Sequence, residues 1–274
     1  TENIKFDQHN PHIVNIVFKN LSLLAQREND IKILYYRTAA SEPVVYNLDP
    51  PKCSIDEILK IDTLGPFESY APLAKNKIEQ IAIENNINPT LIAALVAQES
   101  SFDPKAISWA KAVGLTQVTP IANKEIIELI NTKKEWPVDK RISEMSYLQL
   151  KARIYMNKIN EKTDWRLDKE KSLEGGILFI SRLRGYWSQK SSVKLLKRVF
   201  DENIPWTDII LASYNSGAYR VKKSIKRNRK KWLEDEELRE AKKYVRNIRS
   251  YCYAFSDLEE VSPPYKSKNK IVKR

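Results

Sequence analysis

Glu99 is the residue whose type and position most clearly suggest acid–base chemistry. Asn88 is a typical helix cap, Pro89 suits the first helical position, and apolar residues recur at helical spacing at 91, 92, 95 and 96. Glu99 continues this apolar face into the last turn, where partial burial and the negative end of the helix dipole both raise a carboxyl pKa. A raised pKa suits a general acid near neutral pH. On spacing alone, a surface glutamate at a helix end is the simpler interpretation.

The other residues that commonly carry catalysis are scarce. His9 and His12 are the only histidines, and catalysis by a Ser-His-Asp or Cys-His arrangement would have to recruit the amino-terminal segment that holds them. Two histidines also exclude a histidine-rich metal cluster. Cys53 and Cys252 are the only cysteines, and they fit either one disulfide or two buried thiols. Carboxylate chemistry is therefore the leading option.

The elements that must position Glu99 are mostly helical. Helical patterns occupy residues 73–84, the segment of Glu99, and residues 123–131 and 143–158. Residues 1–70 differ, because short β-branched or aromatic runs at 13–18, 33–36 and 43–46 favour strands, whereas 21–27 favours a helix. We predict a mainly α chain with an amino-terminal accessory segment over 1–70 that contains short strands. A helical domain follows over 71–258, with an extended connection at about 121–171, and a basic tail covers 259–274.

The residues after Glu99 complete a dense motif: Ser100, Phe102, Pro104, Ala106, Ser108, Ala112, Gly114, Leu115, Gln117 and Pro120. Their spacing resembles the catalytic motif of the lytic transglycosylases, goose-lysozyme-like enzymes that cleave peptidoglycan. That motif reads Glu-Ser-x-Phe-x-Pro-x-Ala, then Ser, Gly-Ala, Gly-Leu-Met-Gln and Pro. Three later segments resemble further motifs of the family in the same order, at 172–183, 211–221 and 240–248. The resemblance spans residues 71–255, roughly two thirds of the chain.

The resemblance implies a lysozyme-like fold and a muramidase of lytic transglycosylase type. Glu99 would protonate the oxygen of the β-1,4 bond between N-acetylmuramic acid and N-acetylglucosamine, then accept the proton of the muramyl 6-hydroxyl to give a 1,6-anhydro product. No cofactor and no metal is implied, and Asp103 is expected to be structural. Gly176 matches the family motif at 172–183, and we expect the helix of this segment to be core scaffold. The residues expected to position the sugars are Ser108, Gln117, Tyr214, Asn215 and Tyr244.

Three positions depart from the family pattern near Glu99. Lys111 stands where the family has Gly, and Thr116 and Thr119 stand where it has Met. The loss of two flexible apolar residues and the gain of a cation predict altered sugar contacts. We hypothesise an enzyme specialised for chemically modified glycan, or one that admits water and acts as a hydrolytic lysozyme.

The charge of the chain favours a polyanionic partner. The formal net charge is +12 and the pI is about 9.4, which suits nucleic acid, an anionic membrane surface or bacterial cell wall. No apolar run approaches the roughly 18 residues of a membrane span. No signal peptide is visible, and a start at Thr1 fits a mature form whose leader has been removed. With the resemblance, we expect a monomer that acts on peptidoglycan glycan strands in the bacterial periplasm or after secretion.

Two alternatives come from other functional classes. Residues 110–129 could be taken for a DNA-binding helix-turn-helix, but Pro120 falls where the recognition helix should run, and we expect no nucleic-acid partner. A non-catalytic wall-binding module is the other alternative, against which the retention of Glu99 argues. The basic run at 220–231 indicates a solvated helix face with local pairing, or a contact with anionic wall. Trp136 and Trp165 fit buried structural roles better than sugar stacking.

Overall fold

The structure is a computed structural model of the whole chain. It describes four short strands in the first 45 residues and residues 53–68, 72–130 and 136–256. The chain divides into two compact units, one of residues 53–257 and one that combines 1–52 with 258–274. In the second unit, β1 (Asn3–Phe6) pairs antiparallel with β2 (Val14–Val17), and β3 (Leu34–Tyr35) with β4 (Val44–Val45).

Three of these four strands lie where the sequence predicts them, and β1 was not predicted. The predicted helix at 21–27, both histidines and the basic tail lie outside the described residues.

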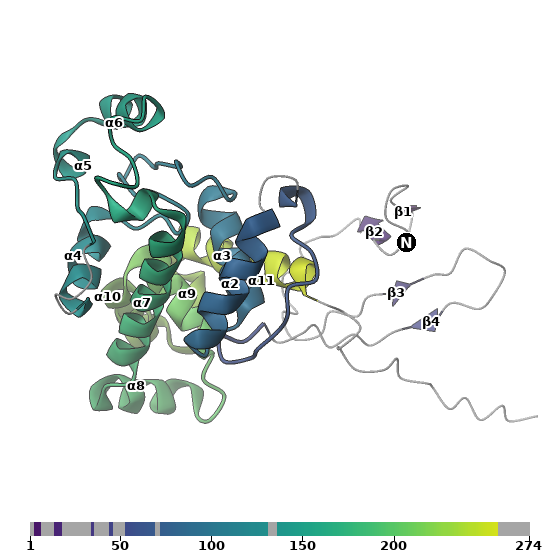
Figure 1. Cartoon of the computed structure of the whole chain (residues 1–274). Coiled ribbons are helices and arrows are strands. Elements are labelled where there is room, and N and C mark those ends of the chain that lie inside the picture. The colour runs from purple at the N-terminus through teal and green to yellow at the C-terminus, as the bar shows by residue number, and fades with distance from the viewer. Residues whose placement is uncertain are drawn as a thin grey trace, which may run out of the picture. The chain divides into compact units, whose positions relative to one another are not determined.

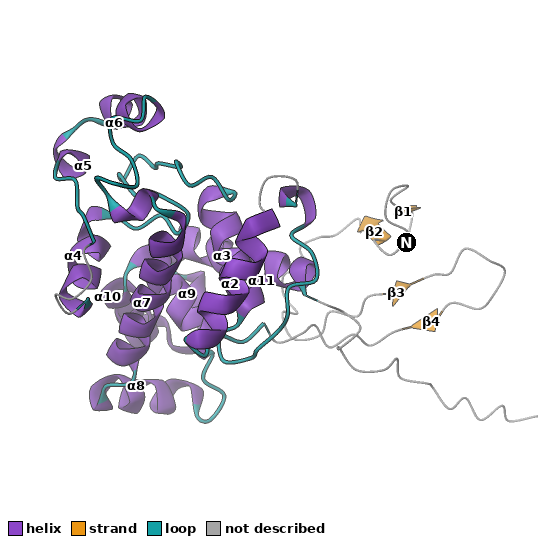
Figure 2. Cartoon of the chain, viewed as in Figure 1, coloured by secondary structure: helices purple, strands orange, loops and turns teal. Residues whose placement is uncertain are grey.

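The unit of residues 53–257 is built from helices, as predicted (Figures 1 and 2). Its helices are η1 (Gly65–Phe67), α2 (Pro72–Glu84), α3 (Pro89–Ser100), α4 (Pro120–Leu129), α5 (Arg141–Glu144), α6 (Tyr147–Tyr155), η2 (Trp165–Leu167), α7 (Lys169–Trp187), α8 (Lys190–Phe200), α9 (Trp206–Ser216), α10 (Ala218–Asn228), η3 (Arg229–Glu234), η4 (Glu236–Leu238) and α11 (Arg239–Phe255). Among the described residues, no helix has the length and apolar character needed to cross a bilayer.

Helix α3 is the centre of this unit. Asn88 caps it by accepting hydrogen bonds from the backbone N–H groups of Thr90 and Leu91, and Pro89 follows at the first position, as predicted. Every residue from 89 to 97 is buried, because the helix is apolar on all sides and must be enclosed by others. Helices α2 and α11 pack against it, and α9 packs against α11.

The connection between α4 and α7 forms its own small cores. The predicted helix at 143–158 is two helices, α5 and α6, because Ser146 begins α6 with a capping box to Gln149. Trp136 and Trp165 are buried with ring centroids 4.6 Å apart, and the indole N–H of Trp165 donates to Asn123 Oδ1 at 2.8 Å. Their structural interpretation is therefore confirmed.

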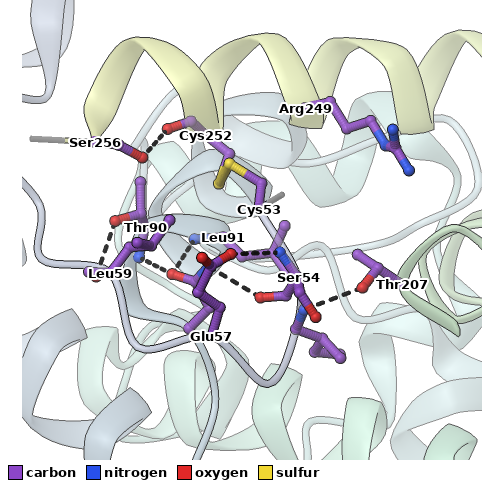
Figure 3. Close-up of a disulfide and its surroundings, with 12 residues drawn as sticks. Cys53, Ser54, Glu57, Leu59, Thr90, Leu91, Thr207, Arg249, Cys252 and Ser256 are labelled. Carbon is purple, nitrogen blue, oxygen red and sulfur yellow. Dashed lines mark hydrogen bonds between the residues drawn. A yellow bond between two sulfur atoms is a disulfide. The ribbon is translucent and has the colours of Figure 1, made fainter. Parts of the chain in front are cut away.

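Residues 53–68, which the sequence pattern groups with the amino-terminal segment, pack on the helices. Ile55, Ile61 and Leu64 are buried in the main core. Cys53 forms a disulfide with Cys252 of α11, with the two Cα atoms 6.2 Å apart (Figure 3). Of the two states open to these cysteines, the structure therefore has the disulfide.

The disulfide closes a loop of 199 residues, so it should stabilise the unit mainly by restricting the unfolded chain. We expect reduction to lower the free energy of unfolding by about 2–5 kcal/mol. Guanidinium denaturation with and without reductant measures this loss. The double variant Cys53→Ser/Cys252→Ser is the control and should unfold at the same midpoint in both conditions. An unchanged midpoint of the parent protein after complete reduction would contradict the prediction.

Candidate active site

The carboxyl of Glu99 is held between α3 and α11. The hydroxyl of Tyr244, on α11, donates a hydrogen bond to Glu99 Oε1 at 2.5 Å. Next to this pair, the side-chain amide of Asn247 donates to Gln98 Oε1 at 3.0 Å. The two bonds fix the register of α11 against α3 and place the phenol of Tyr244 beside Glu99.

Burial is the main influence on the acidity of Glu99. It raises the pKa of this carboxyl from 4.5 to about 7, while the hydrogen bond from Tyr244 acts in the opposite direction. The residue is nevertheless only partly buried by solvent-accessible surface. Glu99 can therefore carry a proton near neutral pH, which a general acid requires.

Tyr214, at the end of α9, approaches the same site. Its hydroxyl donates to the backbone carbonyl of Thr116 at 2.7 Å. Burial and the nearby charge of Glu99 raise the pKa of Tyr214 well above its usual value, so the phenol stays protonated and remains a donor. Gly217 ends α9 with a φ of 84° and leaves the side chain of Asn215 exposed. The hydrogen bond of Tyr214, in the segment 211–221 that resembles a family motif, thus connects α9 to the loop that follows α3.

That loop, residues 106–118, is braced by its own side chains. Isolated antiparallel bridges join Ile107 to Val113 and Val113 to Val118. The side-chain amide of Gln117 donates to the carbonyls of Ala106 and Gly114 at 3.0 and 2.9 Å. Ser108 Oγ accepts a hydrogen bond from the backbone N–H of Ala112 at 3.1 Å. Both predicted sugar-positioning side chains therefore already support the loop.

Two glycines of the motifs allow this loop to approach α7. Gly114 has a φ of 83°, and a Cβ built there would lie 1.8 Å from the carbonyl oxygen of Arg166. A Cβ on Gly176 of α7 would lie 2.7 Å from Cγ2 of Thr116. Larger residues would push the loop away from α7, since real Cβ contacts are not this short. The group that approaches Gly176 is the Thr116 side chain.

The three departures from the family pattern each make a hydrogen bond within the protein. Lys111 has a φ of 60°, a conformation that glycine adopts readily, and its ammonium donates to the carbonyl of Ser143 at 2.7 Å. Thr116 is 1% exposed and its hydroxyl donates to the carbonyl of Ser172 at 2.7 Å. Thr119 caps α4 by accepting from the N–H of Ala122. A direct sugar contact through the Thr116 side chain is therefore incompatible with its burial.

Sequence reasoning missed the buried ion pair between Asp164 and Arg166. The guanidinium contacts Asp164 at 2.8 Å, and its Nη1 donates to the carbonyl of Val118 at 3.4 Å. The pair therefore supports the end of the loop that carries Gln117. Opposite charges two residues apart were the only signal in the sequence, and such spacing is common on surfaces. Asp103, expected to be structural, accepts from the N–H of Lys105.

A comparison with known families gives a match over the segment that carries Glu99. Residues 76–139 match the family described as "Transglycosylase SLT domain". Within these residues, which make up less than half of the chain, the protein is similar to a transglycosylase SLT domain. The match includes Glu99, Ser108 and Gln117, and it confirms the resemblance inferred from the motifs. Tyr214, Asn215 and Tyr244 lie beyond the matched residues, on α9 and α11. Among the described residues, no cluster of three or more His, Cys, Asp or Glu side chains could hold a metal ion near the SLT domain or elsewhere.

Two solved structures are similar to the chain. One is the lytic transglycosylase Slt of Pseudomonas aeruginosa in an inactive mutant form, with 20% sequence identity and a TM-score of 0.42. The other is the 70 kDa soluble lytic transglycosylase of Escherichia coli, with 18% identity and a TM-score of 0.39. Each alignment covers 73% of this chain. The chain spans 28% of the length of either protein.

The raised pKa of Glu99 predicts a pH-dependent cost to stability. The carboxyl titrates near 4.5 when unfolded and near 7 in the fold, so between these values the folded state binds more protons and stability falls as pH rises. Glu99→Gln removes this cost. We expect it to raise the free energy of unfolding by up to about 3 kcal/mol at pH 8, and by much less at pH 5.

Urea denaturation at both pH values measures the gain. Glu128→Gln, which removes one negative charge from an exposed position on α4, is the matched control. A gain for Glu99→Gln that is equal at pH 5 and pH 8 would show that burial of the charge is not its cause.

Proposed function

We propose that the chain is a lytic transglycosylase that cleaves the β-1,4 bond between N-acetylmuramic acid and N-acetylglucosamine in peptidoglycan. The observation that carries this proposal is the state of Glu99 within the SLT domain. Its carboxyl has a pKa raised to about 7 by burial and accepts a hydrogen bond from a buried tyrosine.

Glu99 would act in two proton transfers. It first donates its proton to the glycosidic oxygen while the bond from this oxygen to the anomeric carbon breaks, which leaves an oxocarbenium-like sugar. The carboxylate then takes the proton of the muramyl 6-hydroxyl, whose oxygen bonds to the anomeric carbon and gives the 1,6-anhydro ring. The hydrogen bond from Tyr244 stabilises the carboxylate between the two steps. Glu99 ends protonated, so the cycle is balanced without a second carboxylate.

The remaining site residues would hold the sugars. Asn215 is exposed at the end of α9, so its amide can both donate to and accept from a sugar hydroxyl. Tyr214 and Tyr244 supply protonated phenols beside Glu99. Ser108 and Gln117 would contribute to sugar binding by keeping the loop in shape. The donors and acceptors that they do not use within the loop would bond to sugar hydroxyls.

A location in the bacterial periplasm or outside the cell agrees with two features of the chain. The Cys53–Cys252 disulfide fits an oxidising compartment, and a net charge of +12 fits an anionic wall. Two cations of the basic run are paired locally, because Arg227 pairs with Asp235 and Glu237, and Lys223 with Glu237. This pairing supports the interpretation of a solvated helix face. We propose a monomer that acts on glycan strands.

The other functional classes have less support. Residues 110–118 form turns and isolated bridges, and α4 begins only at Pro120. The first helix of a helix-turn-helix is therefore missing, which argues against nucleic-acid recognition by this segment. A wall-binding module without activity would not need the buried carboxyl of Glu99, which costs stability. A hydrolytic lysozyme on the same fold, in which water replaces the 6-hydroxyl, is the second candidate.

Mass spectrometry of muropeptides tests the proposal. We expect purified peptidoglycan digested with the parent protein to yield anhydro-muropeptides, and digestion with Glu99→Gln to yield none, because the variant cannot donate a proton. Glu128→Gln, which removes an exposed carboxyl from α4, is a control that keeps the site intact. Products with reducing ends that still require Glu99 would instead identify a hydrolytic lysozyme. Equal activity of the parent and Glu99→Gln would exclude both.

We further propose that the chain prefers chemically modified glycan, because Lys111, Thr116 and Thr119 replace the usual residues of the loop. We expect initial cleavage rates to differ by about tenfold or more between native, de-acetylated and O-acetylated walls, as a change of about 1.4 kcal/mol in binding the transition state would produce. The measurement compares the three walls at equal mass. Identical rates on all three would remove this finer proposal and leave the general activity intact.

A further inference from the structure

An exposed aromatic pair lies on the loop that follows Glu99. The ring of Trp109 stacks on the ring of Tyr147, the first residue of α6, with centroids 4.0 Å apart and planes inclined by 28°. Trp109 nevertheless remains 78% exposed. Tyr147 covers one side of the indole, and most of the remaining surface faces solvent. An indole is costly to leave in water, and a fixed one offers a large apolar surface to a ligand.

The turn that carries Trp109 is fixed from several sides. Ser108 and Ala112 exchange backbone and side-chain hydrogen bonds across it, and the N–H of Lys111 donates to the carbonyl of Ser108. The ammonium of Lys111 ties the turn to Ser143 of α5. Trp109 is therefore held by its neighbours before any ligand arrives, which lowers the entropy cost of binding.

Tyr147 is fixed as well. Ser146 caps α6 through a capping box with Gln149, so the helix begins at a defined residue. The ammonium of Lys151 lies 5.9 Å from the centroid of the Tyr147 ring. The ring that stacks on Trp109 therefore belongs to a capped helix N-terminus, and Lys151 lies near this ring. The stack on Tyr147 is a tertiary contact that sets the orientation of the indole.

We infer that Trp109, supported by Tyr147, is a stacking platform for a sugar ring of the glycan strand, separate from the residues that act on the cleaved bond. The inference rests on the proposed function. A pyranose ring has an apolar face of C–H groups that packs on an indole, and its hydroxyls stay in water at an exposed position. The platform belongs to the loop of the site, because Trp109 follows Ser108 in the loop whose Thr116 carbonyl accepts the hydrogen bond from Tyr214.

Binding in a background that cannot cleave tests the platform. The protein with Glu99→Gln is titrated calorimetrically with the β-1,4-linked hexamer of N-acetylglucosamine and with soluble glycan strands. We expect Trp109→Ala to weaken both affinities about five- to tenfold. Trp109→Phe should retain most of the affinity, and Tyr147→Ala should lose part of it because the indole is no longer held. Tyr155→Ala removes an exposed aromatic residue of the same helix, and this control should bind as the parent does.

The outcomes separate the platform from the proposed activity. Unchanged affinities for Trp109→Ala, with wall cleavage by the parent intact, would overturn the platform and leave the enzyme. Weakened binding by Trp109→Ala without any muropeptide product from the parent would support the platform and remove the enzyme. Self-association of the parent that Trp109→Ala abolishes, with glycan affinity unchanged, would assign the surface to a second copy of the chain and overturn the inference.

Discussion

The burial of one carboxyl at the end of an apolar helix is the constraint on which the rest of this structure depends. Helix α3 is buried from residue 89 to 97, so α2 and α11 must enclose it, and Glu99 is enclosed with them. The resulting rise of the Glu99 pKa costs stability above neutral pH and provides a proton below it. Tyr244 limits the rise by donating a hydrogen bond to the same carboxyl. The core and the chemistry of the site therefore have one physical origin.

The loop after α3 meets this constraint with an irregular backbone. Ser101, Phe102, Lys111, Gly114 and Gln117 all have positive φ, and four of these are not glycine, so the conformation is strained. Side chains compensate by bonding to backbone groups within the loop or beside it, as Gln117 and Thr116 do. The bond from Tyr214 to the Thr116 carbonyl joins the loop to α9. Three segments that are distant in sequence thereby meet beside Glu99.

Local signals in the sequence predicted α3 with its cap and the mainly helical fold, because each depends on residues only a few positions apart. The family resemblance named Tyr244 as a site residue, and its bond to Glu99 is seen only in the structure. The Cys53–Cys252 disulfide, the Asp164–Arg166 pair and the Trp109–Tyr147 stack could not be predicted. The first and last join residues distant in sequence, and the second is recognisable only once its burial is known. The break between α5 and α6 did have a local signal, the capping box at Ser146, which the apolar pattern across it obscured.

Lys111 shows how a departure from the family pattern can act without touching the substrate. A non-glycine residue in the left-handed region costs about 1 kcal/mol or more, and the bond from its ammonium to the Ser143 carbonyl offsets part of that cost. A glycine would relieve the backbone but would release the turn from α5. Because Trp109 lies two residues earlier in this turn, the lysine bears on the orientation of the indole. Under the proposed preference for modified glycan, Lys111 would act through the geometry of the turn, since its ammonium is bonded to Ser143.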